Sequence, residues 1–237
     1  MALVQKDIRS QGGSKERVAA LQKFFDTGPG GYGEGYVFIS LRVPQSRAFA
    51  KKYIYLDLKD VQALLKSKIH EERLIALLIL VARFKEADAK EQKQIYDIYL
   101  KNTRSINNWD LVDTSAEHIV GAYLWDKNRK VLSDLIKSKD LWERRIAMLA
   151  TFHFIKKGES KDALRFAKML LKDEHDLMHK ASGWMLRELG KRVSEKDLRA
   201  FLEKHAHVMP RTMLRYALEK LSAQDRAYYM GLKKVRT

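Results

Sequence analysis

Three short segments of this chain recur at positions 145, 180 and 215, each with a basic residue followed closely by a small one. They are Arg145-Ile146-Ala147, Lys180-Ala181-Ser182 and Arg215-Tyr216-Ala217. A small residue at a fixed point of a repeat lets paired helices approach closely, and the basic residue before it can line the exposed face. A period of 35 residues with two helices per unit is typical of an α-solenoid. We therefore predict an all-α fold with a concave basic face; the alternative is a plain helical bundle.

Helical patterning extends over most of the chain. Beyond residues 43–44, apolar residues recur at i, i+3, i+4 and i+7, which indicates helices of about ten to twenty residues joined by short connections. An earlier helix is expected over about 15–27, followed by a glycine-rich loop at 28–35. The predicted organisation is one domain over 1–237, with a repeat-containing body at about 15–222 and short tails at both ends.

Start signals support the expected helices. Asp140-x-x-Glu143 and Ser194-x-x-Asp197 resemble capping boxes, the second with the shorter acid. Ala76 lies in an analogous helix about two repeat periods before Ala147.

Composition excludes several classes of protein. The chain has 237 residues, of which 46% are hydrophobic and 32% charged, the balance of a soluble globular protein. Cysteine is absent, which excludes disulfides, thiolate metal sites and a cysteine nucleophile. The N-terminus lacks the apolar core of a signal peptide, and the longest apolar run, Leu74 to Ala82, is too short to span a bilayer. We expect a soluble, cytoplasmic protein.

Charge favours a polyanion as the partner. The formal net charge is +16, from 46 Lys and Arg against 30 acidic residues. Nucleic-acid-binding, ribosome-associated and membrane-surface proteins share such a balance. The basic residues occur throughout the chain, which favours a folded basic surface over a disordered arm.

One carboxylate stands out against this charge. Trp109 and Asp113 are four residues apart, so a helix places them on one face. An anion in a phosphate-binding surface weakens simple binding, so an Asp113 that points into that surface is expected to do chemistry. The structural alternatives are that Asp113 caps a helix or pairs with a nearby base, and that Trp109 is a core residue.

Several motifs together resemble those of a known family. They are Phe38 to Pro44, Asn108 to Asp113, Leu141 to Ala147 and Lys180 to Glu188. The chain is similar, over about residues 15–222, to the DNA alkylation repair family of HEAT-like-repeat DNA glycosylases. Trp-Asp-x-Val-Asp and Lys-Ala-x-Gly-Trp are its most specific patterns. One departure is Ser40, where the family usually has Gly.

The resemblance implies a right-handed α-α superhelix of HEAT-like helix pairs and excision of purines alkylated at N3 of adenine or N7 of guanine. It implies that Asp113 is catalytic, that Trp109 and Trp184 flank the sugar, and that Arg145 holds a phosphate. An alkylated purine is cationic and leaves as a neutral base, so no general acid is needed. The sugar then becomes oxocarbenium-like, which one fixed carboxylate stabilises. The family is thought to leave the lesion stacked, so we predict no deep base pocket.

Further basic and aromatic residues are expected to contact DNA: Arg144, Lys180, Arg187, Arg211, Arg215 and Tyr32. Each basic residue has the alternative of a solvated helix face. Trp125 and Trp142 are assigned to packing. Double-stranded alkylated DNA is the expected partner of a monomer that needs no obligatory protein partner.

Other kinds of site are less consistent with the sequence. His175-Asp176-x-x-His179 imitates a zincin helix but has Asp for Glu and no suitably spaced third ligand, so no metal and no cofactor are expected. The 28–35 loop lacks the Gly-Lys-Ser/Thr of a P-loop. Two further functions remain: a non-catalytic helical-repeat nucleic-acid binder, and a solenoid scaffold for acidic proteins. The scaffold leaves the Trp–Asp pair unexplained.

Overall fold

The computed structural model describes residues 1–232, and these contain helices and no β-strand beyond an isolated bridge between Val37 and Ile69. The all-α prediction is therefore confirmed for this part of the chain. The fold divides into two compact units, unit 1 (Met1–Ser115) and unit 2 (Ala116–Thr237). The expected single domain stays a prediction.

Unit 1 comprises α1 (Ala2–Ser10), α2 (Lys15–Phe24), α3 (Val43–Lys52), α4 (Leu58–Leu65), α5 (His70–Glu86), α6 (Ala89–Lys101), the 3-10 helix η1 (Thr103–Ser105) and α7 (Trp109–Ala116), whose last residue begins unit 2. Helices α3, α4 and α6 pack on α5. Most residues of the apolar run that begins at Leu74 are buried in α5, so the run is a core segment. No helix in residues 1–232 is long and apolar enough to cross a membrane.

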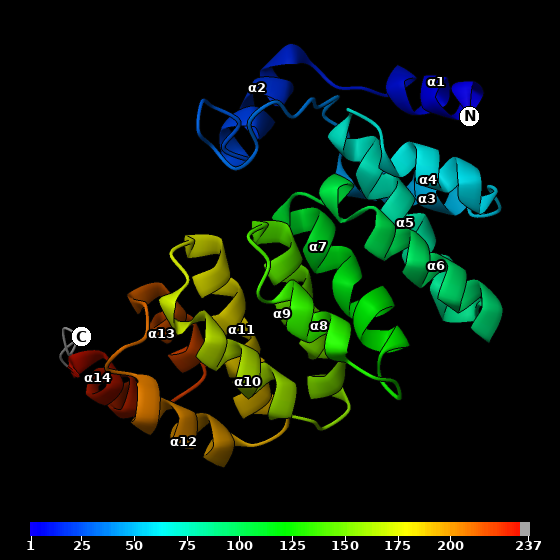
Figure 1. The fold of residues 1–237 in the computed structure, drawn as a ribbon. Coiled ribbons are helices and arrows are strands. Elements are labelled where there is room, and N and C mark those ends of the chain that lie inside the picture. The colour runs from blue at the N-terminus through cyan, green and yellow to red at the C-terminus, as the bar shows by residue number, and fades with distance from the viewer. Residues whose placement is uncertain (233–237) are drawn as a thin grey trace. The chain divides into compact units, whose positions relative to one another are not determined.

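Unit 2 comprises the π-helix η2 (Glu117–Gly121), α8 (Lys130–Leu135), α9 (Leu141–Lys156), α10 (Lys161–Met169), the 3-10 helix η3 (Leu170–Lys172), α11 (Asp176–Arg192), α12 (Glu195–His205), α13 (Arg211–Leu218) and α14 (Ala223–Gly231). Helices α9, α11 and α13 pack side by side, while α10, α12 and α14 pack against them from a second layer (Figure 1). The recurring segments fall in α9, α11 and α13, and their small residues Ala147, Ser182 and Ala217 are fully buried. The repeat in the sequence thus corresponds to successive helix pairs.

A glycine sets the separation of α11 and α13. A Cβ on Gly183 would lie 2.4 Å from the carbonyl oxygen of Met213 and 2.5 Å from the Cβ of Tyr216. Real Cβ atoms do not approach other atoms this closely, so a glycine is required here. It directly precedes Trp184 and thereby fixes where α11 presents that ring.

The expected start signals and loop are confirmed. The Asp140 carboxylate accepts hydrogen bonds from the backbone N–H of Trp142 (2.7 Å) and Glu143, and the Ser194 hydroxyl accepts one from Asp197 (3.0 Å). Residues 28–35 contain no helix, and Gly30 within them has a φ of 77°.

Each of the two predicted tails contains a helix. At the N-terminus, Val4 and Ile8 lie one turn apart on α1 and are buried, and Arg9 forms an ion pair with Glu72 of α5 (2.6 Å). At the C-terminus, α14 occupies most of the predicted tail, while residues 233–237 of that tail lie outside the described residues. Apolar residues at helical spacing explain why α1 docks instead of extending into solvent.

Candidate functional site

Helix α7 begins at Trp109 and presents a mixed surface. Leu111 and Val112 are fully buried, whereas Trp109 and Asp113 are partly exposed. The backbone N–H of Trp109 donates to the side-chain oxygen of Asn108 (2.7 Å) at this helix start. The structure therefore brings Trp109 and Asp113 together on the accessible side of α7, as the spacing predicts.

The indole ring of Trp109 is held by residues from the N-terminal segment. It stacks on Phe25 with ring centroids 5.4 Å apart and meets Phe24 edge-on at 5.8 Å. Its N–H donates to the hydroxyl oxygen of Tyr32 (3.2 Å). Tyr32, predicted to contact DNA, thus also contacts Trp109. The indole N–H of Trp109 therefore already has an acceptor within unit 1.

A buried histidine anchors the first turn of α7, and the sequence analysis missed it. The Nε2 of His70 lies 2.8 Å from the Oδ2 of Asp110, and the imidazole is 2% exposed. The rings of Phe25 and Phe38 pack against the imidazole, with centroids 5.1 and 4.9 Å away. The signal in the sequence that could have indicated this pair was Asp110, the acidic residue directly after Trp109. Its carboxylate fixes the turn from which the Trp109 side chain projects.

The surroundings of Asp113 include a buried phenol. Tyr99 is fully buried, and its hydroxyl lies 3.0 Å from the Ser115 hydroxyl. Burial raises the pKa of Tyr99, and the Asp113 carboxylate raises it further, so the phenol stays protonated. Tyr99 is therefore a neutral neighbour of Asp113, and its hydroxyl is hydrogen-bonded to Ser115.

The segment before α3 has an unusual backbone. Ser40 adopts a φ of 63°, a left-handed conformation that favours glycine. The Glu71 carboxylate, itself buried, accepts hydrogen bonds from the backbone N–H groups of Ile39, Ser40 and Leu41 at 3.1, 2.6 and 3.3 Å. These bonds hold the backbone at position 40 in this conformation.

The other two predicted site residues belong to unit 2. Arg145 of α9 is 4% exposed and donates from Nη1 to the carbonyl oxygen of Leu177 at 2.6 Å. Trp184 of α11 is partly exposed, and its ring lies 5.7 Å from that of Phe152. Trp142, assigned to packing, is buried. Of the four predicted site residues, Trp109 and Asp113 belong to unit 1, and Arg145 and Trp184 belong to unit 2.

The predicted DNA contacts fall into two groups. Three of them form ion pairs. Arg144 pairs with Asp173 (2.7 Å), and Lys180 pairs with Asp176 (2.8 Å). Arg187 pairs with both Glu188 (3.0 Å) and Glu219. Arg211 and Arg215 are exposed. Arg211 donates to the carbonyl oxygen of Met230 (2.6 Å), and Arg215 donates to the hydroxyl oxygen of Thr212 (3.4 Å).

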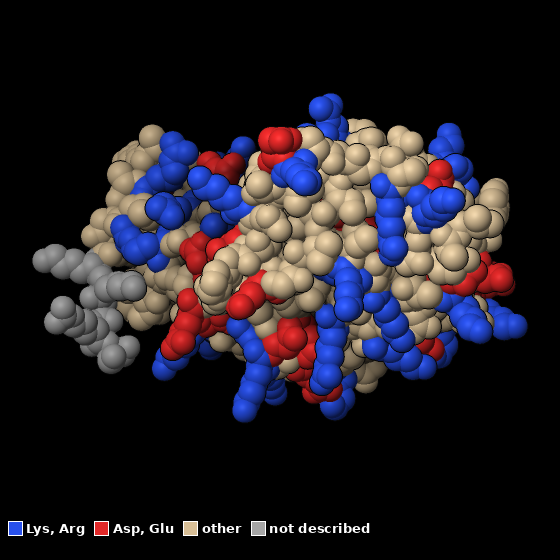
Figure 2. Space-filling model, turned by 90° about the horizontal axis from the view of Figure 1, so that it is seen from above, with Lys and Arg blue, Asp and Glu red and all other residues tan. Residues whose placement is uncertain are grey.

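Basic residues are widely distributed. In the face drawn in Figure 2, Lys and Arg side chains are spread over the surface among the acidic ones instead of forming one tail. This distribution agrees with the folded basic surface that the sequence favours.

The histidines of the zincin-like segment have structural roles. His175 precedes α11, and its Nδ1 accepts from the backbone N–H of Leu177 (3.2 Å). The Nε2 of His179 lies 2.5 Å from the carbonyl oxygen of Asp173. Within residues 1–232, no group of three or more His, Asp or Glu side chains is arranged to hold a metal ion.

Comparisons with known proteins identify the family. The family model described as DNA alkylation repair enzyme matches residues 4–221. The structure named as a predicted DNA alkylation repair enzyme from Enterococcus faecalis is similar in fold, with a TM-score of 0.71 and 15% identity, over 90% of this chain and 98% of that one. No curated protein matches the chain. Since the family model spans nearly the whole sequence, the chain belongs to the DNA alkylation repair enzyme family.

Proposed function

We propose that this protein is a DNA glycosylase of base-excision repair, which hydrolyses the N-glycosidic bond of cationic alkylated purines. The observation that supports this most directly is the position of Asp113, a partly exposed carboxylate one turn from Trp109 on α7. In a family of DNA alkylation repair enzymes, an anion at such a point opposes phosphate binding and suits a positive sugar.

The proposed reaction needs one protein carboxylate. The bond between C1′ and the purine nitrogen breaks, and its electron pair neutralises the positive charge of the alkylated base. The deoxyribose becomes oxocarbenium-like, and Asp113 stabilises this charge. Asp113 also orients the water that adds to C1′ and accepts its proton. The products are a free alkylpurine and an abasic site.

The remaining residues act around the sugar in this proposal. Trp109 offers its π system to the developing cation, and Phe25, Phe24 and Tyr32 hold its ring in place. Trp184 offers a second aromatic surface. Arg145 donates to a phosphate next to the lesion, in addition to its bond with Leu177. Because the lesion stays stacked, no deep base pocket is required.

DNA binding is proposed to use the basic residues predicted above. Arg211 and Arg215 are the best placed of them, because both are exposed and neither has an ion-pair partner in residues 1–232. We also keep as proposals a right-handed superhelix of HEAT-like repeats, and a cytoplasmic monomer that acts on duplex DNA without a cofactor.

The test compares wild type with Asp113→Asn on duplex DNA treated with a methylating agent, and measures released bases and abasic sites. The substitution keeps size and removes charge, so we expect excision to fall on the order of 10²-fold or more. Asp57→Asn is the matched control, because Asp57 is an exposed carboxylate of unit 1 that makes no side-chain cap hydrogen bond.

Three results are informative. Excision by wild type and Asp57→Asn but not by Asp113→Asn supports the proposal. Equal excision by all three proteins contradicts the role of Asp113. Absence of excision by wild type, with retained DNA binding, supports the alternative of a non-catalytic nucleic-acid binder.

A further inference from the structure

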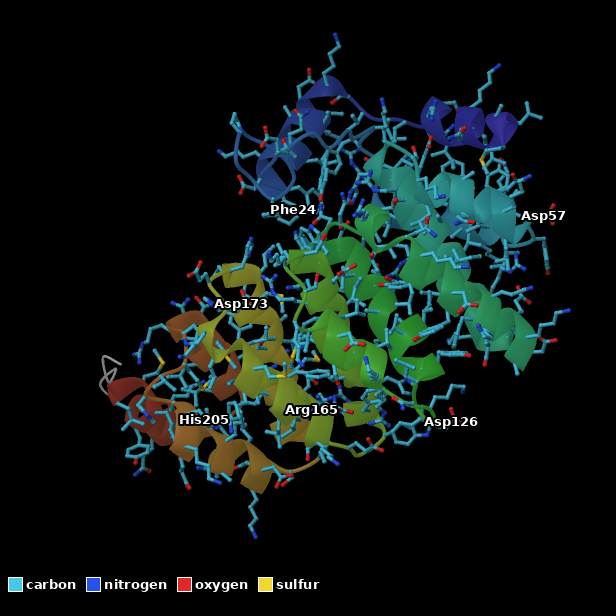
Figure 3. All side chains as sticks on the ribbon, viewed as in Figure 1. Phe24, Asp57, Asp126, Arg165, Asp173 and His205 are labelled. Atoms are coloured by element: carbon cyan, nitrogen blue, oxygen red, sulfur yellow. The ribbon has the colours of Figure 1, made fainter. Side chains whose placement is uncertain are left out.

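A hollow in the second layer of unit 2 lies between α10 and α12. Its volume is about 460 Å³, within the range of about 300–1,000 Å³ that is typical of small-molecule sites. Figure 3 labels two of the residues that line it, Arg165 on α10 and His205 at the end of α12. The residues of unit 2 predicted to contact DNA lie instead on α9, α11 and α13, and none of them lines the hollow.

One end of the hollow carries positive charge. Lys168 lines it from α10, and Lys204 and His205 line it from α12. Both lysines are exposed, and neither forms an ion pair within residues 1–232. Burial lowers the pKa of His205, and the charges of Lys168, His207 and Lys204 lower it further. The charged groups that act on this imidazole are therefore all bases.

The other charged residues of the hollow already have partners. Asp197 is the acid among the lining residues. It lies eight residues before His205 on α12, about 12 Å away along the helix. Its carboxylate accepts a hydrogen bond from the Ser160 hydroxyl at 3.0 Å. Arg165 forms an ion pair with Asp162 at 2.8 Å. Lys168 and Lys204 are thus the cations that remain for an anionic ligand.

Apolar side chains form the rest of the surface. Leu164 of α10 and Ala200 and Phe201 of α12 line the hollow. The ring centroid of Phe201 lies 4.7 Å from that of His205. An apolar surface with two adjoining rings fits a flat, largely apolar group. The hollow therefore combines a place for an anion with a place for a ring.

We propose that this hollow binds a small organic phosphate of the nucleoside monophosphate type. Lys168 and Lys204 contact the phosphate, and the ring of the ligand packs beside His205 and Phe201. Ammonium groups form strong, charge-assisted hydrogen bonds to phosphate oxygens, and an anion between the two lysines relieves their mutual repulsion. Stable docking of a protein needs about 800 Å² from each partner, far more than these few side chains offer. The site is independent of the proposed excision reaction.

The first experiment identifies the chemistry of the ligand without DNA. The full-length protein is titrated with adenosine 5′-monophosphate, with adenosine and with inorganic phosphate, and NMR follows the imidazole signals of His205. We expect the monophosphate to bind at least about tenfold more tightly than adenosine or phosphate, because only the monophosphate makes both contacts. Bound monophosphate should also raise the pKa of His205, since a nearby anion favours the charged imidazole.

The second experiment tests the two cations. Lys168→Gln and Lys204→Gln are each expected to raise the Kd for adenosine 5′-monophosphate about tenfold, the effect of losing one hydrogen bond from a charged donor. Lys161→Gln of α10 and Lys196→Gln of α12 are the matched controls, because both lysines are exposed and neither lines the hollow. The control variants should bind the monophosphate as wild type does.

Four results would overturn the inference. Equal losses in the controls would show attraction to the net charge and not to a site. Inorganic phosphate binding as tightly as the monophosphate would remove the ring contact. Displacement of the monophosphate by undamaged duplex DNA would assign the hollow to the DNA-binding surface. Lys168 and Lys204 lie in the last turns of their helices, where cations stabilise the carbonyl ends. Unchanged binding with a lowered melting temperature in both lysine variants would show that structural role alone.

The result is distinguishable from that of the excision assay. Binding of the monophosphate is measured without DNA, and excision is measured without the monophosphate. If wild type excises alkylpurines but binds no monophosphate, the inference fails and the glycosylase stands. If wild type excises nothing but Lys168 and Lys204 determine monophosphate binding, the inference stands and the glycosylase fails.

Discussion

At the scale of single residues, Ser40 adopts a strained backbone conformation that hydrogen bonds to its neighbours impose. Its left-handed backbone conformation costs an L-residue about 1–2 kcal/mol. Its hydroxyl is buried and makes no hydrogen bond within residues 1–232. The Glu71 carboxylate holds the conformation by accepting the N–H groups around it. The backbone strain at Ser40 is therefore a consequence of the hydrogen bonds that hold the segment before α3.

We expect Ser40→Gly to raise the free energy of unfolding by about 1 kcal/mol, because relief of strain exceeds the added chain entropy of glycine. Thermal melting of the variant measures this. Ser40→Ala removes the hydroxyl and keeps the Cβ, so its stability should lie between those of wild type and Ser40→Gly. A less stable Ser40→Gly would contradict the explanation.

At the scale of elements, the packing of α11 on α13 depends on Gly183. A Cβ there would meet backbone atoms of α13, which cannot move aside as a side chain can. Gly190 of the same helix differs, because the three atoms nearest to a Cβ at that position all belong to the side chain of Leu198.

Gly183→Ala is therefore expected to destabilise unit 2 by about 2 kcal/mol or more. Gly190→Ala should cost less, since the Leu198 side chain can shift and alanine has the better helix propensity. Chemical denaturation of both variants measures the difference. Equal stability of the two proteins would show that α11 and α13 adjust freely.

The histidines of α9 and the α11 start link the stability of unit 2 to pH. Burial lowers the pKa of His153 and of His175 from the ordinary 6.5, so the folded state favours the neutral rings. The unfolded chain binds protons more readily below that value. The stabilisation is therefore present above about pH 6.5 and is lost as the pH falls.

We expect the melting temperature of unit 2 to fall between about pH 7.5 and about pH 5.5, and the fall to be smaller in His153→Gln. Calorimetry at several pH values measures both. A melting temperature that rises on acidification would contradict the assigned direction of the pKa shifts.

At the scale of the whole molecule, the formal net charge of +16 governs association with DNA. Phosphate contacts release counterions, so affinity should fall steeply with salt, on the order of 10³-fold or more between about 50 and about 200 mM. Fluorescence-anisotropy titrations at several salt concentrations measure the slope of log K against log[salt]. Binding that is insensitive to salt would contradict the proposed basic surface.

The contribution of an individual arginine to the salt dependence of DNA binding should depend on whether that arginine forms an ion pair within the protein. Arg215→Gln is expected to reduce the slope by about 0.9, because Arg215 is exposed and has no carboxylate partner in residues 1–232. Arg199→Gln is the matched control, since Arg199 is held by Asp225 and Glu195, both at 2.8 Å. Equal effects of the two substitutions would show that charge alone, and not placement, sets the slope.

The sequence by itself determined the helical class, the helix pairs behind the recurring segments, the caps at Asp140 and Ser194, and the common face of Trp109 and Asp113. These follow from local periodicity and hydrogen bonding, which a short stretch of sequence encodes. The family resemblance came from local motifs in the same way.

Only the tertiary structure decided the surroundings of those residues. The His70–Asp110 pair joins positions 40 residues apart, and the aromatic support of Trp109 comes from α2 and the loop after it. The left-handed conformation of Ser40 depends on Glu71, and the ion pairs of Arg144 and Arg187 depend on acids about 30 residues away. Such contacts form when distant segments pack, because side-chain partners are set by the packed chain and not by spacing along it.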